Sequence, residues 1–218
     1  MGTQPKLSTL RTEKTAPSTN VTLDAGSPII QVMNPSTDIE VTLPSVDSEF
    51  KIINRSANRI TVKSSNGDTI DSFLNGRCEL VSTVAAPTLG SEWHVVNIEE
   101  QGTFSFSVTN VSGVVSTAGR LMVYQRKNDQ VYGNFHMTST NLSANSDIIF
   151  RVSIPVASNF AGETQANGIF LVQPLAQTQE SSGGIIRADA ANNELLVNLY
   201  NIDGGGNPSQ GTFRYRIV

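Results

Sequence analysis

The sequence predicts an all-β protein, in which an antiparallel β-sandwich or barrel module and then a jelly-roll-like β domain follow an extended N-terminal arm. Short stretches alternate between apolar and polar residues, as where Ile39 and Val41 flank Glu40, and this is the pattern of a half-buried strand. Asn-Gly pairs, which tolerate positive φ and close tight hairpins, separate some of these stretches. Only 16% of the residues are charged. Surface helices usually carry many Glu and Lys residues, so this composition favours strands and turns over helices.

The chain of 218 residues is long enough for two modest β domains, each with a core. We expect an arm over residues 1–20, an N-terminal β-sandwich or barrel domain over 21–100 and a C-terminal jelly-roll-like domain over 101–218. The net charge of −4 gives no reason to expect a nucleic acid as partner. No apolar run approaches the roughly 20 residues that span a bilayer. We therefore expect a soluble protein without a membrane partner, made in a reducing cytoplasm.

The first 20 residues, MGTQPKLSTLRTEKTAPSTN, show no sustained period and contain two prolines and three cations against one carboxylate. Such a composition is typical of a disordered tail. The alternative is an arm that orders by docking onto a partner, because fixing a backbone costs about 1 to 2 kcal/mol per residue and needs a surface that offsets this cost. We expect an anchoring arm in which two leucines fill small pockets and the cations meet acidic residues. Its anchoring residues are Lys6, Leu7, Leu10, Arg11 and Lys14.

Short strands at regular spacing are expected from Val21 to Ile98. The stretches FKIIN and RITVK are interpreted as paired strands of a hairpin. The pair Asn66-Gly67 is expected to close one tight turn, and Asn75-Gly76 another between TIDSFL and RCELVST. The single cysteine, Cys78, cannot form an internal disulfide and is interpreted as a buried apolar residue.

Longer strands are expected after residue 102, in the stretches TFSFSVTNV, RLMVYQRKNDQVYGNFHMTST, SDIIFRVSIP, NGIFLVQPLAQ, GGIIRADA, ELLVNLYNI and GTFRYRIV. Two long polar segments, at 157–168 and 201–211, are expected to be loops, which are either binding surfaces or tolerated insertions. Exposed aromatic rings can stack on sugars. Tyr200, beside the second loop, is the best candidate, and we name Tyr200, Asp203 and Asn207 as the residues for contact with a host receptor or glycan.

Catalytic motifs are missing from the sequence: it has no GxSxG, Walker or HExxH pattern. The two histidines, His94 and His136, have no partners at metal-ligand spacing. The acidic pairs Asp68 with Asp71 and Glu99 with Glu100 are interpreted as solvated turn residues. We expect a protein that is not an enzyme and has no catalytic residues, metal or cofactor.

A recurring pattern appears at residues 38–97. Four elements follow one another in it: a VTLP strand at Val41 to Pro44, an F.I.N.S...ITV stretch at Phe50 to Val62, an S.G.TI turn at Ser65 to Ile70 and a W.VV strand at Trp93 to Val96. This segment resembles the β modules of tailed-bacteriophage virion surface proteins. Residues 103–218, with YQRKNDQVYGNFHM and IPVASNF, look like the C-terminal β domains of phage fibres and head-decoration proteins.

The resemblance implies a homotrimeric virion protein exposed on the particle. As a capsid decoration (cement) protein it would bind the major capsid protein and stabilise the shell, and it would be assembled in the host cytoplasm onto the capsid surface. As a tail or head fibre it would bind a host surface glycan. With no coiled-coil shaft, 218 residues are short for a fibre, so decoration is the expectation and the fibre its alternative. A sugar-binding module and a polysaccharide-degrading enzyme are the two other classes considered.

Overall fold

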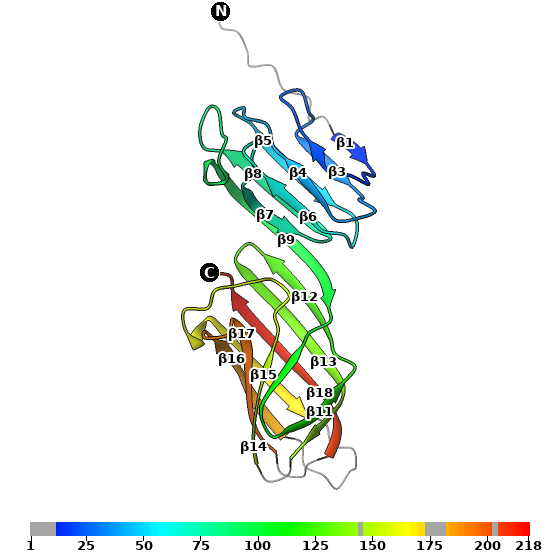
Figure 1. The fold of residues 1–218 in the computed structure, drawn as a ribbon, viewed down its shortest axis with the longest axis vertical. Coiled ribbons are helices and arrows are strands. Elements are labelled where there is room, and N and C mark those ends of the chain that lie inside the picture. Colours follow the sequence, from blue (N-terminus) through cyan, green and yellow to red (C-terminus); the bar gives the residue numbers. More distant parts are fainter. Residues whose placement is uncertain (1–11, 144–145, 173–181, 202–204) are drawn as a thin grey trace, which may run out of the picture. The chain divides into compact units, whose positions relative to one another are not determined.

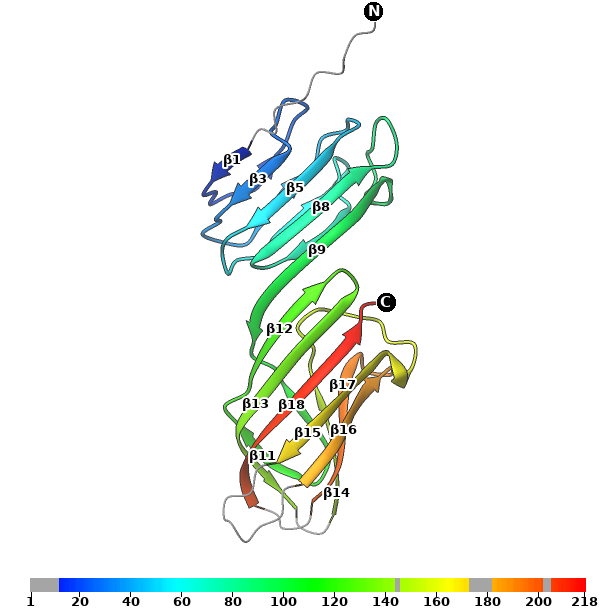
Figure 2. The same ribbon diagram turned by 180° about the vertical axis from the view of Figure 1, so that it is seen from behind.

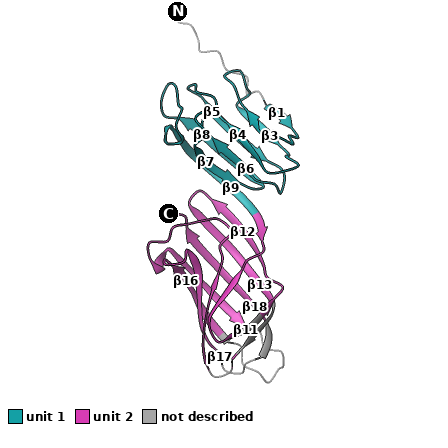
Figure 3. Ribbon diagram, in the orientation of Figure 1, with its two compact units in different colours: residues 1–101 teal, residues 102–218 magenta. Residues whose placement is uncertain are grey.

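The computed structural model describes residues 12–143, 146–172, 182–201 and 205–218. The chain forms two compact units, Met1–Gln101 and Gly102–Val218 (Figure 3). Both consist of β-strands, with only two 3-10 helices of three residues each among the described residues. The predicted all-β class is confirmed.

The first six strands of the first unit alternate between two sheets and pair in parallel (Figure 1). Thr12 lies opposite Ile30, and Ile30 lies opposite Lys51. Val21 lies opposite Val41 in the second sheet. Each of the first four strands therefore pairs with one that lies 18 to 21 residues further along, as in a coil with about 20 residues per turn. The strands are β1 (Thr12–Thr15), β2 (Val21–Thr22), β3 (Ile30–Met33), β4 (Ile39–Thr42), β5 (Glu49–Asn54) and β6 (Ile60–Lys63).

The parallel coil corrects the prediction of an antiparallel module for this part of the chain. FKIIN and RITVK do not form a hairpin, because β5 and β6 lie in different sheets. Side chains at the turns bond to the backbone of the next turn of the coil: Asn20 Oδ1 accepts from the Glu40 N–H (2.9 Å) and Asp38 Oδ1 from the Arg59 N–H (2.7 Å). Alternation of apolar and polar residues shows which side of a strand is buried but not the direction of its neighbour.

Antiparallel strands complete the first unit: β7 (Thr69–Phe73), β8 (Gly76–Ser82) and β9 (Trp93–Phe104), with the short helix η1 (Gly90–Glu92) before β9. Asn66-Gly67 lies in the β6–β7 turn, where Gly67 has a φ of +92°. This predicted turn is confirmed. Asn75-Gly76 does not close a hairpin, because β7 and β8 belong to different sheets. That prediction was wrong.

The core of the first unit lies between its two sheets. The side chains of Val41, Ile52 and Val62 are fully buried there. The Trp93 ring lies 6.2 Å from the ring of Phe50. Cys78 is also fully buried in this core, as expected from its sequence context.

All described strand pairs of the second unit are antiparallel. Their order is β12-β13-β18-β15-β16-β17-β14-β10, and β11 also pairs with β13 (Figures 1 and 2). The jelly-roll topology expected for this unit stays a prediction. The strands are β10 (Val108–Ser112), β11 (Val114–Ala118), β12 (Leu121–Lys127), β13 (Gln130–Leu142), β14 (Ser146–Val152), β15 (Ala166–Val172), β16 (Ser182–Asp189), β17 (Glu194–Asn201) and β18 (Gly205–Arg216), with the helix η2 (Glu163–Gln165) before β15.

Phenylalanine rings fill the core of the second unit. The Phe135 ring lies 5.4 Å from that of Phe106 and 5.7 Å from that of Phe170. It covers its cross-strand partner Gly211 on β18, where an added Cβ would lie 2.3 Å from the ring. The strand pair β13–β18 thus places an aromatic ring over a glycine, an arrangement that pins strand register.

The polar segment 201–211, which was expected to be a loop, lies mostly in strand β18. The strand begins at Gly205, and residues 202–204 lie outside the described residues. Its register with β13 shifts between Met137 and Thr140, and Pro208 of β18 lies opposite this shift. A proline has no N–H for the ladder, and a bulge is where a strand accommodates it. The other predicted loop, 157–168, ends earlier than expected, because η2 and the start of β15 lie within it.

Candidate functional site

Of the five predicted anchoring residues, Lys14 alone lies among the described residues. Lys6, Leu7, Leu10 and Arg11 lie outside the described residues. Lys14 is exposed on β1, where it lies opposite Val32 of β3 in the same chain. Residues 12–15 are therefore a strand of the first unit and not part of a separate arm, which corrects that part of the prediction.

The predicted receptor residues do not form one cluster among the described residues. Tyr200 lies on β17 opposite Asp147, and its side chain is 53% exposed. Asp203 lies outside the described residues. Asn207 lies on β18 opposite Thr140. Strands β17 and β18 are not neighbours in the sheet, because β15 and β16 lie between them.

Most of the residues considered for chemistry have ordinary surroundings. Glu99 and Glu100, which were interpreted as solvated turn residues, lie on strand β9 instead, and Glu100 is buried there, so that interpretation was wrong for this pair. His94 and His136 are exposed on β9 and β13. Asp68 accepts a hydrogen bond from the Gly90 N–H (3.2 Å), and Glu99 forms an ion pair with Arg77 (2.9 Å). Within the described ranges, no group of three or more His, Cys, Asp or Glu side chains is arranged to hold a metal ion. Neither short helix in those ranges has the length and apolar character needed to cross a bilayer.

Large apolar side chains are exposed on one face of the second unit. They come from β12, β13, β15 and β16, and between 41% and 56% of each is exposed. Strand register aligns them: Val123 lies opposite Asn134, Asn134 opposite Thr212, Thr212 opposite Ile169 and Ile169 opposite Ile185. We call this surface the outer apolar face, and it consists of Leu121, Val123, Tyr132, Ile169, Leu171 and Ile185.

The strands beneath the outer apolar face are apolar on both sides. In β12, Leu121 and Val123 point outward while Met122 and Tyr124 are buried. A continuous apolar run of this kind is typical of a strand that is covered on both faces. The runs LMVY, GIFLV and GII could therefore have revealed this face from the sequence.

Strand β18 lies between β13 and β15 and presents polar side chains in the middle of the outer apolar face. Arg214 Nε donates a hydrogen bond to Asn167 Oδ1 of β15 (3.0 Å). A shallow hollow of about 400 Å³ lies beside Tyr132, over β12, β13 and β18. The face thus combines apolar anchors, a concave region and hydrogen-bonding groups, which is the make-up of a protein interface.

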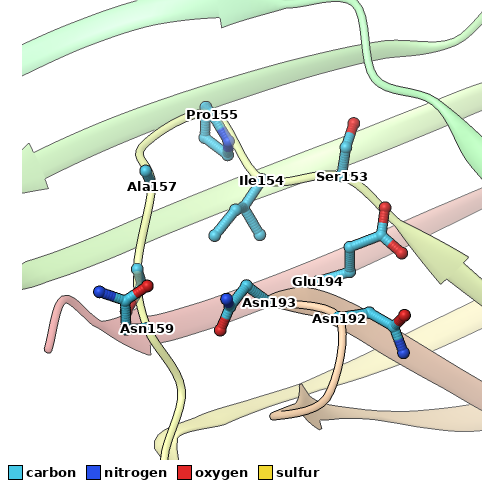
Figure 4. A pocket seen from close by; sticks show the side chains of 9 residues that line it. Ser153, Ile154, Pro155, Ala157, Asn159, Asn192, Asn193 and Glu194 are labelled. Atoms are coloured by element: carbon cyan, nitrogen blue, oxygen red, sulfur yellow. The ribbon is translucent and has the colours of Figure 1, made fainter.

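A second hollow, of about 470 Å³, lies between the segment after β14 and the turn that joins β16 to β17 (Figure 4). Ser153 and Glu194 line one side of it, Asn159 the other, and Ile154 lies in the middle. We call it the asparagine pocket. It is lined by Ser153, Ile154, Pro155, Ala157, Ser158, Asn159, Asn192, Asn193 and Glu194.

Hydrogen bonds to the rest of the unit hold both walls of the asparagine pocket. Tyr215 Oη donates to the Val156 carbonyl (2.6 Å) and accepts from the Val156 N–H (3.1 Å). Ser158 Oγ donates to the Arg216 carbonyl (3.1 Å). Asn193, with a φ of +54°, accepts from the Phe160 N–H through Oδ1 (3.0 Å) and so ties one wall to the other. Contacts within the chain therefore fix the course of both walls.

Asp189 fixes the turn that forms one wall of this pocket. Its carboxylate accepts hydrogen bonds from Arg151 Nε, Asn192 Nδ2 (2.9 Å) and the Ala191 N–H (3.0 Å). Burial opposes ionisation, but the hydrogen bonds and the charge of Arg151 prevail and hold the pKa of Asp189 below its usual value.

Lowering the pH should weaken the second unit through Asp189. The pKa of Asp189 is lower in the folded chain than in the unfolded chain. The carboxylate therefore stabilises the folded unit fully above its unfolded pKa of about 3.9, and this stabilisation is lost as the pH falls through its folded pKa. Hydrogen exchange of peptides within 182–201 should show wild type better protected than Asp189→Asn at pH 7, with a smaller difference at pH 3. An unchanged difference at the two pH values would contradict this role.

Comparison with known proteins gives no relative. No family model matches the chain, and no curated protein or solved structure matches it either.

Proposed function

We propose that the chain is a structural protein of a tailed-bacteriophage virion. It assembles as a homotrimer, binds the major capsid protein at the capsid surface and stabilises the shell as a decoration protein. The resemblance of residues 38–97 and 103–218 to phage virion modules supports the virion assignment. The observation that carries self-assembly is the outer apolar face.

The outer apolar face has the size of an interaction surface. Its six side chains, each about half exposed, lie on both sides of the polar strand β18 and together expose on the order of several hundred Å². The largest apolar patch on a monomer is about 300 to 600 Å² and is often functional. With its polar neighbours, the face approaches the roughly 800 Å² that each partner contributes to a standard interface.

A second copy of the chain suits this face better than an unrelated charged partner. The six side chains that define it are apolar or neutral. Two cations lie beside them, Arg214 on β18 and Arg187 on β16, both opposite Asn167, and Arg187 is paired with Glu163, so identical chains bring few like charges together. Around a threefold axis, the face of one protomer meets a neighbouring surface of the next, and a closed ring of three results. Burying the face removes apolar surface from water, which is the main driving force for association.

Attachment to the shell is assigned to the N-terminal segment and β1. Among the described strands, β1 ends its sheet, so one side of its backbone is open to a further strand. An added strand would gain main-chain hydrogen bonds at such an edge. Lys14 on this strand adds a cation for an acidic shell surface.

The variant Val123→Asp/Ile169→Asp tests this function. Two carboxylates in the buried interface should weaken association at least 100-fold, because their desolvation is unfavourable. Light scattering after size-exclusion chromatography should show a trimer for wild type and a monomer for the variant. Cosedimentation with undecorated capsid shells should fall as well, because a single copy lacks the avidity of three.

Val111→Asp is the matched control, since Val111 is an exposed valine of the same unit outside the outer apolar face. It should leave both the trimer and cosedimentation unchanged. A monomeric wild type, or a double variant that assembles and sediments like wild type, would overturn the proposal.

A further inference from the structure

The asparagine pocket belongs to neither the outer apolar face nor the strand edge at β1. We propose that it binds a neutral saccharide of one or two sugar units. The binding itself does not depend on the proposed assembly. Its biological role, which is to hold the virion at a host surface glycan, rests on the proposed function.

The pocket contains both kinds of surface that a sugar ring needs. Ile154, Pro155 and Ala157 provide an apolar patch that can pack on the C–H face of a pyranose. Asn159 and Glu194 provide amide and carboxylate groups around this patch (Figure 4). The volume of about 470 Å³ falls within the range of small-ligand pockets, about 300 to 1,000 Å³.

The hydrogen bonds that hold the pocket leave donors and acceptors for a ligand. Asn193 uses Oδ1 for the Phe160 N–H, and its Nδ2 group retains two donors that have no partner among the described residues. Asn192 uses one N–H for Asp189, so its Oδ1 is left to accept. Sugar hydroxyls both donate and accept, and a wall that offers both groups therefore suits them better than a purely cationic or acidic ligand.

Charge at the pocket disfavours an anionic ligand. Glu194 places a carboxylate in the lining, and it is half-buried. The nearby guanidinium of Arg151 is bonded to Asp189 and is not a lining group. Sialic acids, uronic acids and phosphates would bring a negative charge toward Glu194, whereas a neutral sugar can donate two hydroxyl hydrogen bonds to its carboxylate.

Strand pairing makes the pocket rigid before binding. Val152 of β14 lies opposite Leu195 of β17, so the residues that follow and precede them, Ser153 and Glu194, emerge side by side. The bonds from Tyr215 to Val156 then fix the course of the outer segment. A preformed site reduces the entropy that binding would otherwise lose.

A glycan array that carries neutral, sialylated and sulfated glycans tests the inference on the full-length chain. We expect wild type to bind a subset of the neutral glycans and none of the charged ones. Titration calorimetry with the corresponding free saccharide should show about tenfold weaker binding for Glu194→Gln, which corresponds to about 1.4 kcal/mol. Asn159→Ala should weaken binding severalfold.

Glu163→Gln is the matched control, because Glu163 is an exposed carboxylate of the same unit that pairs with Arg187 outside the pocket. Its affinity for the saccharide should equal that of wild type. Three outcomes would overturn the inference: no binding to any glycan of the array, binding to charged glycans only, or wild-type affinity for the saccharide in Glu194→Gln. Because the assay requires neither capsids nor a particular oligomeric state, glycan binding with failed capsid attachment would overturn the proposed function alone.

Discussion

Replacing Gly76 with alanine should unfold the first unit. An added Cβ would lie 1.9 Å from the Glu99 carbonyl oxygen and 2.9 Å from the Glu100 Cα, both backbone atoms of the paired strand β9. No side-chain rotation relieves a clash with backbone, so β8 and β9 must separate. We expect a loss of about 4 kcal/mol or more, the range of the most severe substitutions. Hydrogen exchange of peptides from β8 and β9 should show the loss.

Gly26→Ala is the control for this substitution in the same unit. Its added Cβ would meet the Asp24 Oδ1 at 3.4 Å, an ordinary contact. We expect a change within about 0.5 kcal/mol, as for most surface substitutions. Equal stability of the Gly76 and Gly26 variants would show that β8 does not lie as close to β9 as described.

Replacing Gly211 with alanine should destabilise the second unit by about 3 kcal/mol. The new Cβ would lie 2.3 Å from the ring of Phe135, which is 1% exposed and packed against the rings of Phe106 and Phe170. In a close-packed core, the ring can move only by displacing its neighbours. Urea unfolding followed by hydrogen exchange of peptides in β13 and β18 measures the change.

A second substitution separates this clash from a general weakness of β18. Phe135→Leu removes the ring and should cost stability when made alone, because it leaves a cavity. In the Gly211→Ala background it also removes the clash, so the double variant should be more stable than the sum of the two single effects predicts. Strict additivity of the two effects would contradict the described contact.

Local features of the fold could be predicted from the sequence. Alternation at Ile39 to Val41 indicated a half-buried strand, and the pair Asn66-Gly67 indicated a tight turn, because both signals depend on residues close together in the chain. The burial of Cys78 was expected for the same reason.

The direction of strand pairing in the first unit could not be read from alternation. A signal was nevertheless present, since VTL occurs at Val21 and again at Val41, and the structure pairs these two residues in parallel. A search for internal repeats of about 20 residues would have favoured a coil over hairpins. Hairpin turns were predicted instead, because Asn-Gly pairs are a strong local signal for tight turns.

Neither surface of the second unit was identified as a whole in advance, although part of the asparagine pocket, from Ala157 to Asn159, lies in the segment 157–168 that was considered as a binding loop. The outer apolar face depends on the neighbours that strand order gives to Val123 and Ile169, which are distant in the sequence. The asparagine pocket brings Asn159 close to Asn193 only because β14 pairs with β17. Tyr200 was favoured for its place beside the predicted loop 201–211, but a lone aromatic residue does not show which residues surround it.

The parallel coil of the first unit also determines how such a protein can change in length. Because Thr12, Ile30 and Lys51 stack in one column, adding or removing one winding of about 20 residues leaves every remaining rung in its place. Each winding would alter the height of the stack by one strand spacing, about 4.8 Å. Evolution could therefore adjust this unit as a spacer in fixed increments without redesigning its interior.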